Sequence, residues 1–216
     1  MLKFLEGFDS YGAGTFQSSY KWDNANVVTL SAGRFSGLAA FLDTTILTKS
    51  IPSSTGMTVG FAMILPEDGG DFLELFDSVA ATVITVGTQA TSSLFYVTST
   101  TTEYSTMPAA RNTWIYFEIS VVDFSSSAAG NVTIRMNGDL IFSSSIGFIL
   151  TGSGLAGGLS IFGPGANSIG YDDLYICDET GAYNTTYIED GEILTCRLYY
   201  MLLFRRRYKD RHSLLN

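Results

Sequence analysis

Apolar and polar residues alternate along several short segments of the chain, and the clearest of these segments runs from Trp114 to Val121. Its odd-numbered residues are all apolar, whereas its even-numbered residues read Trp, Tyr, Glu and Ser. A period of two places successive side chains on opposite faces of a strand. We therefore predict a strand whose odd positions, from Ile115 onward, face the core, with Trp114 and Tyr116 on the opposite face.

A hairpin follows this strand. Residues Val132 to Met136 alternate in the same way, and Asn137-Gly138 comes directly after them. Asn and Gly both tolerate positive φ, so this pair between two alternating runs predicts a tight turn. The returning strand is expected at 139–142.

Similar runs recur at intervals of roughly ten residues, separated by Gly, Ser, Asn and Asp, which is typical of antiparallel sandwiches rather than of βαβ units. Almost no segment supports a helix. The fold class predicted from this rhythm is all-β, a sandwich or barrel of antiparallel strands. The further expected strands lie near 2–8, 38–42, 58–65, 72–76, 81–86, 94–98, 159–162 and 171–177, and the low-complexity stretches 99–105 and 125–130 are expected to be loops.

Charge divides the 216 residues into a body and a tail. Residues 1–193 hold six Lys or Arg and twenty acids, a net charge of about −14, whereas residues 194–216 hold six basic residues and one acid, about +5. We place a domain boundary near Ile193, between a β-sheet domain (1–193) and an apolar, basic C-terminal tail (194–216). An acidic body repels phosphate backbones, so no nucleic-acid partner is expected.

The tail combines apolar anchors with a basic cluster, and it is the candidate partner-binding segment. An exposed apolar run of this kind tends to aggregate unless something covers it. It either docks on a neighbouring acidic subunit or adds a strand to the edge of its own sheet. The candidate partner-binding residues are Leu202, Phe204, Arg205, Arg206, Arg207, Lys209 and Arg211.

Motifs for catalysis are missing from the sequence. The one histidine, His212, lies in the tail, and no G-x-S-x-G, H-E-x-x-H or Glu-x-Asp-x-x-Glu pattern is present. Gly152 to Gly157 matches G-x-G-x-x-G but precedes an expected strand rather than a helix. Glu74 and Asp77 should face opposite sides of a strand, so they cannot act as a glycosidase pair. We predict no catalytic residue and no enzyme.

No cofactor is predicted, although calcium stays open. Oxygen ligands cluster at 67–71 and at Asp172, Asp173, Asp178 and Glu179. A calcium ion needs six to eight converging oxygens, and sequence cannot show convergence. Cys177 and Cys196 are too few for a disulfide scaffold.

No membrane anchor or signal peptide is expected. The N-terminal residues lack an apolar core, and serines and glycines interrupt the apolar window from Leu140 to Gly163. These features favour folding in the cytosol.

Several stretches together resemble a known family. They are the opening residues 4–11, the run 33–37, the strand 113–118 and the hairpin 134–138, and the most specific is Tyr171 to Gly181, which reads YDDLYICDETG. In this order they are similar to the concanavalin A-like (laminin-G-type) jelly-roll proteins encoded among the structural genes of tailed bacteriophages. The resemblance covers roughly residues 1–193 and implies that they form an antiparallel jelly-roll β-sandwich of concanavalin A-like type. The tail departs from the family pattern.

The resemblance implies a non-enzymatic virion protein that decorates the head or belongs to the tail. It would assemble in the bacterial cytoplasm and bind other copies of itself and other virion proteins. The alternative is a lectin-like module that binds host-surface polysaccharide through aromatic platforms and loop carboxylates, because fold alone does not decide function. A glycan hydrolase is the third and weakest hypothesis.

Overall fold

The structure is a computed structural model that describes residues 1–8, 11, 14–17, 21–24, 26–34, 37–67, 69–125, 132–145, 148–165 and 167–179. The described residues form strands and contain no helix, so none of their segments is a helix that could cross a membrane. The all-β prediction is confirmed. The strands are β1 (Leu2–Glu6), β2 (Gly14–Gln17), β3 (Val27–Ala32), β4 (Leu38–Leu42), β5 (Ile46–Ser54), β6 (Met57–Ile64), β7 (Gly70–Asp77), β8 (Thr82–Thr88), β9 (Leu94–Thr98), β10 (Thr102–Pro108), β11 (Trp114–Val121), β12 (Phe124–Ser125), β13 (Val132–Met136), β14 (Asp139–Ser143), β15 (Ser153–Gly154), β16 (Ala156–Phe162) and β17 (Ile169–Asp178).

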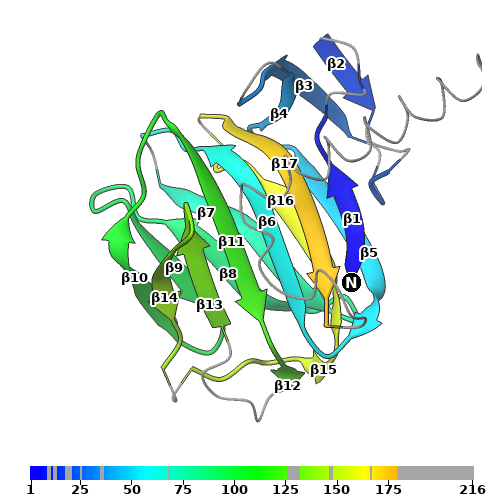
Figure 1. Ribbon diagram of the computed structural model, residues 1–216, viewed down its shortest axis with the longest axis vertical. Helices are drawn as coiled ribbons and strands as arrows, with labels where there is room; N and C mark the ends of the chain where they lie inside the picture. Colours follow the sequence, from blue (N-terminus) through cyan, green and yellow to red (C-terminus); the bar gives the residue numbers. More distant parts are fainter. Residues whose placement is uncertain are drawn as a thin grey trace, which may run out of the picture.

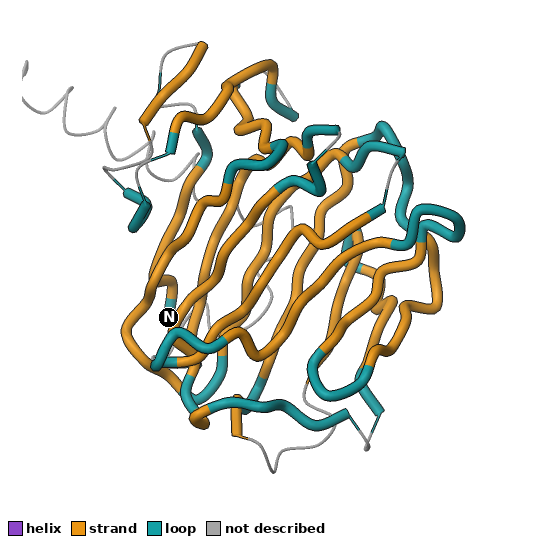
Figure 2. The backbone as a smooth tube through the Cα atoms, turned by 180° about the vertical axis from the view of Figure 1, so that it is seen from behind, coloured by secondary structure: helices purple, strands orange, loops and turns teal. Residues whose placement is uncertain are grey.

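Two antiparallel sheets pack face to face as a jelly-roll sandwich, and Figures 1 and 2 show it from opposite sides. The nine-stranded sheet has the order β14-β13-β11-β6-β17-β4-β3-β2, with β1 also paired to β17. The six-stranded sheet has the order β10-β9-β8-β7-β16-β5. A small third sheet joins β12 to β15.

β17 organises the nine-stranded sheet because two strands share one of its edges. β4 pairs with its first residues, 169–171, and β1 pairs with its later residues, 174–177. The change of partner falls at Asp172 and Asp173, where the register with β6 shifts and Asp173 has a φ of 49°. The Asp172 carboxylate accepts hydrogen bonds from the backbone N–H of Asp173 (2.8 Å) and of Arg34 (3.1 Å). Asp tolerates this left-handed conformation, so the paired aspartates of the YDDLYICD stretch form a β-bulge.

Aromatic rings fill the centre of the core between the two sheets. Phe117 of β11 lies 5.2 Å from Phe61, 5.5 Å from Phe72 and 5.3 Å from Phe95, measured between ring centroids. Tyr171 of β17 crosses the core, and its hydroxyl donates to the backbone carbonyls of Phe72 and Phe162 in the opposite sheet. Edge-to-face and offset contacts of this kind stabilise a core beyond the area they bury.

The predicted faces of β11 are confirmed. Its odd positions belong to the main hydrophobic core, and Trp114 and Tyr116 belong to a separate cluster on the outer side of the sheet. Tyr116 and Glu118 are themselves only 1% exposed, so the outer face of this strand is buried as well.

Most predicted strands coincide with observed ones, and those at 38–42, 94–98 and 132–136 have the predicted ends. The loop predicted at 99–105 is wrong, because β10 begins at Thr102. Thr102 pairs with Thr98 of β9 at the edge of the sheet, and its side chain is exposed. β2, β3, β5, β12 and β15 were not predicted either.

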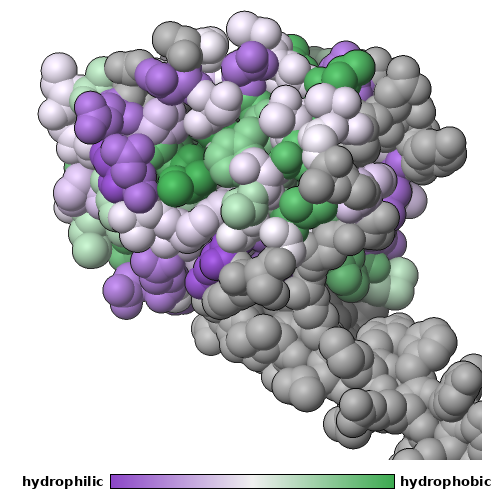
Figure 3. All heavy atoms as spheres, turned by 90° about the horizontal axis from the view of Figure 1, so that it is seen from above, coloured by the Kyte–Doolittle hydropathy of each residue, from purple (hydrophilic) through white to green (hydrophobic). Residues whose placement is uncertain are grey.

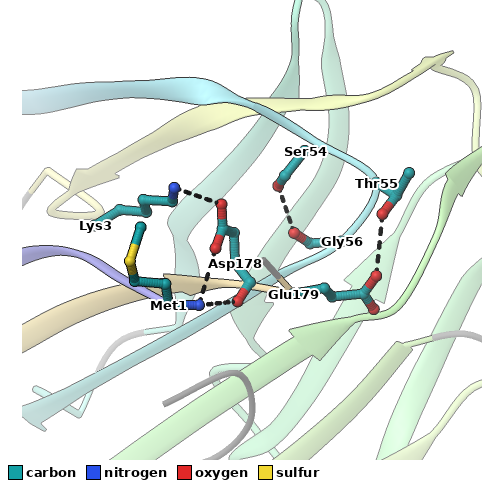
Figure 4. Close-up of polar contacts among 7 residues, drawn as sticks. All are labelled: Met1, Lys3, Ser54, Thr55, Gly56, Asp178 and Glu179. Carbon is teal, nitrogen blue, oxygen red and sulfur yellow. Dashed lines mark hydrogen bonds and ion pairs between the residues drawn. The ribbon is translucent and has the colours of Figure 1, made fainter. Parts of the chain in front are cut away.

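Ionic contacts tie β1 to the end of β17 (Figure 4). The buried Asp178 carboxylate forms ion pairs with the N-terminal amine of Met1 at 2.9 Å and with the Lys3 Nζ at 2.8 Å. Nearby, the Thr55 hydroxyl donates to Glu179 at 3.0 Å. These contacts hold the ends of β1 and β17 beside the turn between β5 and β6.

Candidate functional site

The outer face of the six-stranded sheet carries a continuous polar row. Its residues occupy directly paired positions on all six strands, and a row of this kind spans about 24 Å at the usual interstrand spacing. Two hydroxyl pairs in the row are hydrogen bonded at 3.0 Å, one at each end. From β10 to β5 the row reads Thr102, Thr98, Thr85, Glu74, Ser160 and Thr48.

Two tyrosines lie beside this row. Tyr104 of β10 is 49% exposed and is paired directly with Tyr96 of β9, which is half-buried. The ring of Tyr96 extends over Gly87 of β8, where a Cβ atom would come within 2.3 Å of its Cζ. Its hydroxyl donates to the Asp71 carboxylate of β7 at 2.5 Å. Gly87 is thus needed so that the ring can lie flat across the sheet.

Charge on this face is negative. Burial and the hydrogen bond and charge of Asp71 raise the pKa of the Tyr96 phenol above its ordinary value, so it remains a neutral donor. Burial and the charge of Asp71 also raise the pKa of Glu74, against a hydrogen bond from Thr82 that lowers it. We name the face formed by the polar row together with Tyr96, Tyr104 and Asp71 the tyrosine–hydroxyl face.

The outer face of the nine-stranded sheet holds a second tyrosine that crosses a glycine to reach a carboxylate, and this contact is buried. Tyr175 of β17 lies over Gly60 of β6, where a Cβ would come within 2.2 Å of its Cε1. Its hydroxyl donates to Glu118 of β11 at 2.5 Å, and Arg135 of β13 is the register partner of Glu118. Tyr175 and Glu118 are 0% and 1% exposed. A buried carboxylate that accepts a phenol proton forms a strong hydrogen bond in a low-dielectric setting.

Around this pair lie other side chains of the same face. The Arg34 guanidinium sits 5.7 Å from the ring centre of Tyr116, within range of a cation–π contact. Cys177 is buried in the cluster, and burial raises the pKa of its thiol to about 12, so it behaves as a small apolar residue.

Seen from above, hydrophobic side chains lie among hydrophilic ones and do not form one continuous apolar surface (Figure 3). The part of the surface seen in this view therefore does not offer a broad apolar interface.

The seven predicted partner-binding residues all belong to the tail and lie outside the described residues. They remain predictions, as does the domain boundary near Ile193. His212 and Cys196 also lie outside the described residues. Gly152 to Gly157 forms β15 and the start of β16, so the dinucleotide interpretation of its glycines is rejected.

Of the carboxylates considered for calcium, Asp172 is bonded at the β17 bulge and Asp178 to cations of β1. Within the described residues, no group of three or more His, Cys, Asp or Glu side chains could hold a metal. Asp77 is buried and bonded to a turn, whereas Glu74 faces outward, as predicted from their spacing.

Comparison with known proteins finds solved structures of similar fold. No protein-family model and no curated protein sequence matches the chain. Among solved structures, alginate lyase Aly36B in complex with an alginate trisaccharide is similar, with 13% identity, a TM-score of 0.60, and coverage of 81% of this chain and 97% of the lyase. An endo-β-1,4-glucuronan lyase from Trichoderma reesei has 10% identity and a TM-score of 0.54, with coverage of 82% and 95%. Domain 4 of AbnA, an arabinanase from Geobacillus stearothermophilus in complex with arabinotriose, has 16% identity and a TM-score of 0.51, with coverage of 81% and 91%.

These findings confirm the concanavalin A-like jelly-roll fold and contradict the predicted function. The prediction of a non-enzymatic bacteriophage virion protein is wrong, because the similar structures are polysaccharide lyases and domains of glycan-degrading enzymes. The prediction that the chain is not an enzyme is contradicted by the same lyases. The carbohydrate-binding alternative fits these relatives better. The sequence resemblance identified the fold and wrongly extended it to function.

Sequence reasoning missed the tyrosine–hydroxyl face. Thr102 and Tyr104 were placed in a loop, and no pattern within one strand shows that hydroxyls on six strands line up. The signal available was the excess of Ser, Thr and Tyr in the segment from 82 to 106.

Proposed function

We propose that this chain is a carbohydrate-active jelly-roll domain that binds a glycan chain on the tyrosine–hydroxyl face. The single observation that carries the proposal is the row of paired polar side chains across all six strands, flanked by two outward-facing tyrosines. The fold relatives that bind alginate and arabinan fragments support a carbohydrate ligand.

The chemistry of the face suits a sugar. The exposed ring of Tyr104 offers an apolar surface for the C–H groups of a pyranose, and Tyr96 next to it is fixed by its bond to Asp71. Threonine and serine hydroxyls both donate and accept hydrogen bonds, and carboxylates accept two or more, which matches the hydroxyls of a sugar. Because strands rather than loops hold these groups, the face is preorganised and loses little entropy on binding.

The test is a binding survey by affinity gel electrophoresis and calorimetry with a panel of polysaccharides. Tyr104→Ala should weaken binding about tenfold or more, because an exposed aromatic anchor is removed without disturbing the core. Leu140→Ala is the matched control, since Leu140 is 53% exposed on β14 of the other sheet. Equal binding by both variants and the unmodified protein would refute the proposal.

A second candidate function is glycan cleavage, which is favoured by the similarity to the alginate and glucuronan lyases. Glu118 and Tyr175 are 1% and 0% exposed, so a polymer cannot reach them and they are not its acid and base. In a lyase-type elimination a base removes a carbon-bound proton, a double bond forms, and the leaving oxygen takes up a proton.

Cleavage is tested by incubating the protein with alginate and glucuronan and recording the ultraviolet absorbance of the unsaturated product. No product from the unmodified protein on any uronate polymer excludes lyase activity on these substrates.

A further inference from the structure

We infer that the glycan on the tyrosine–hydroxyl face is an uncharged polysaccharide, and that this face rejects polyuronates. The inference rests on the proposed function, because it names the ligand class of the same site. It departs from what the lyase relatives are named for, since alginate and glucuronan are polymers of uronic acids.

The first ground is the charge carried by the six strands of this sheet. They contain one basic residue, Lys49, whose register partner Leu159 lies in the core and whose Nζ pairs with Asp23. Lys49 therefore does not place its positive charge on the outer face. Arg111, in the segment after β10, donates instead to the backbone carbonyls of Pro66 and Gln89.

Two carboxylates stand on the same face without a facing cation among the described residues of these strands. Asp71 is exposed and Glu74 is half-buried, and they lie on one strand with the hydroxyl row passing through Glu74. A polymer that carries a carboxylate on each sugar would bring like charges toward both. Repulsion of this kind discriminates between ligands more strongly than it changes the affinity for an uncharged one.

The second ground is the neutral part of the face. Hydroxyl side chains occupy the row on both sides of Glu74, with Thr85 on β8 and Ser160 on β16 as its direct partners. A neutral sugar can donate its own hydroxyls to Glu74 and Asp71 and exchange hydrogen bonds with the threonines. The face therefore favours a ligand with many uncharged hydroxyl groups over a ligand that carries carboxylates.

The structure of AbnA domain 4 with arabinotriose shows that a protein of similar fold holds a neutral sugar. Because the relatives include proteins named for charged and for neutral glycans, the fold does not set the ligand class. The side chains of each face must set it.

The experiment measures binding of a neutral galactomannan, of alginate and of chitosan at low ionic strength. The galactomannan should bind about tenfold or more tightly than alginate, and added salt should narrow the gap by screening the repulsion. Asp71→Asn combined with Glu74→Gln should raise alginate binding, and Asp139→Asn on β14 is the control that should not.

The outcomes separate the two proposals. Tighter binding of alginate than of galactomannan, lost in Tyr104→Ala, overturns the charge inference and leaves the glycan-binding face in place. Preferential binding of cationic chitosan also overturns it, because the carboxylates would then select a cation. Binding that Tyr104→Ala leaves unchanged, or no binding of any of these polymers, overturns the proposed function itself.

Discussion

The Tyr175 hydroxyl reaches Glu118 across an intervening strand, at a distance of 2.5 Å, because that strand carries Gly60 between them. The same relationship joins Tyr96 to Asp71 across Gly87 in the other sheet. One contact is buried and the other half-exposed, so the two sites form a natural comparison of one hydrogen bond in two environments.

Tyr175→Phe should destabilise the protein by about 1–3 kcal/mol, because a buried carboxylate loses a hydrogen bond that water cannot replace. Tyr96→Phe should cost well under about 1 kcal/mol, because water can solvate the exposed Asp71. Urea denaturation of both variants measures the difference. Equal losses of stability would show that the burial of Glu118 does not strengthen its contact with Tyr175.

Phe117→Ala should reduce stability by about 3–5 kcal/mol, as truncations of core aromatics do. Phe117 contacts three other phenylalanine rings from both sheets, so the cavity cannot be filled by one small shift. Val79→Ala, at a side chain that is 72% exposed, is the control. A thermal melt identical to that of the unmodified protein would contradict the assigned core position.

The sequence was informative wherever one strand buries one face. The alternation in β11 predicted both its ends and its core side, because a one-residue shift would have moved Phe117 out of the main core to the outer cluster. It was uninformative at β10, where Thr102 to Pro108 pairs at an edge and its burial follows no apolar pattern. Edge strands bury little, so their residues resemble those of loops.

The candidate site was harder to predict for a different reason. Glu74 and Thr85 meet only through register, and register depends on the pairing of strands far apart in the chain. The paired aspartates at 172 and 173 were recognised as a family marker, and only the structure shows that they lie at a bulge in β17.

The Asn137-Gly138 turn offers a local test of the predicted hairpin. Asn137 has a φ of 52° and Gly138 a φ of 89°, and no atom lies within 4 Å of the position of a Cβ on Gly138. Gly138→Ala should therefore cost about 1 kcal/mol through backbone conformation alone.

The side chain of the turn has a separate role. The Asn137 Oδ1 accepts the backbone N–H of Tyr116 at 2.8 Å. Asn137→Gly keeps the conformation and removes this bond, so it should cost about 0.5–1.5 kcal/mol. Chemical denaturation separates the two effects. A Gly138→Ala variant as stable as the unmodified protein would contradict the left-handed turn.

The C-terminal tail makes a prediction about self-association. Residues 194–216 carry about five net positive charges and the preceding residues about fourteen negative ones. We expect the full chain to self-associate, with an affinity that falls as salt is added. A variant that ends at Ile193 should lose this self-association. Light scattering coupled to size exclusion measures it. If the tail is instead a strand of its own domain, deletion lowers the melting temperature and leaves the oligomeric state unchanged.

Asp77 should make stability depend on pH at the turn between β7 and β8. Its carboxylate accepts hydrogen bonds from the backbone N–H groups of Val79 (3.0 Å), Ala81 (2.9 Å) and Ser153 (2.8 Å). Burial acts to raise the pKa of Asp77, but these hydrogen bonds outweigh it and lower the pKa below its ordinary value. A group whose pKa is lower in the folded state stabilises the fold above its unfolded pKa, and this contribution is lost as the pH falls through the folded pKa.

Asp77→Ala should therefore be less stable than the unmodified protein by about 1–3 kcal/mol near neutral pH, since three backbone donors lose their acceptor. The difference should shrink as the medium is acidified past the ordinary pKa of an aspartate, because protonation weakens the same contacts in the unmodified protein. Asp139→Asn, at an exposed position in the β13–β14 hairpin, should show no comparable loss near neutral pH. Urea titrations over a series of acidic buffers measure both variants. A stability difference that stays constant through the acidic range would show that Asp77 acts through packing rather than through its charge.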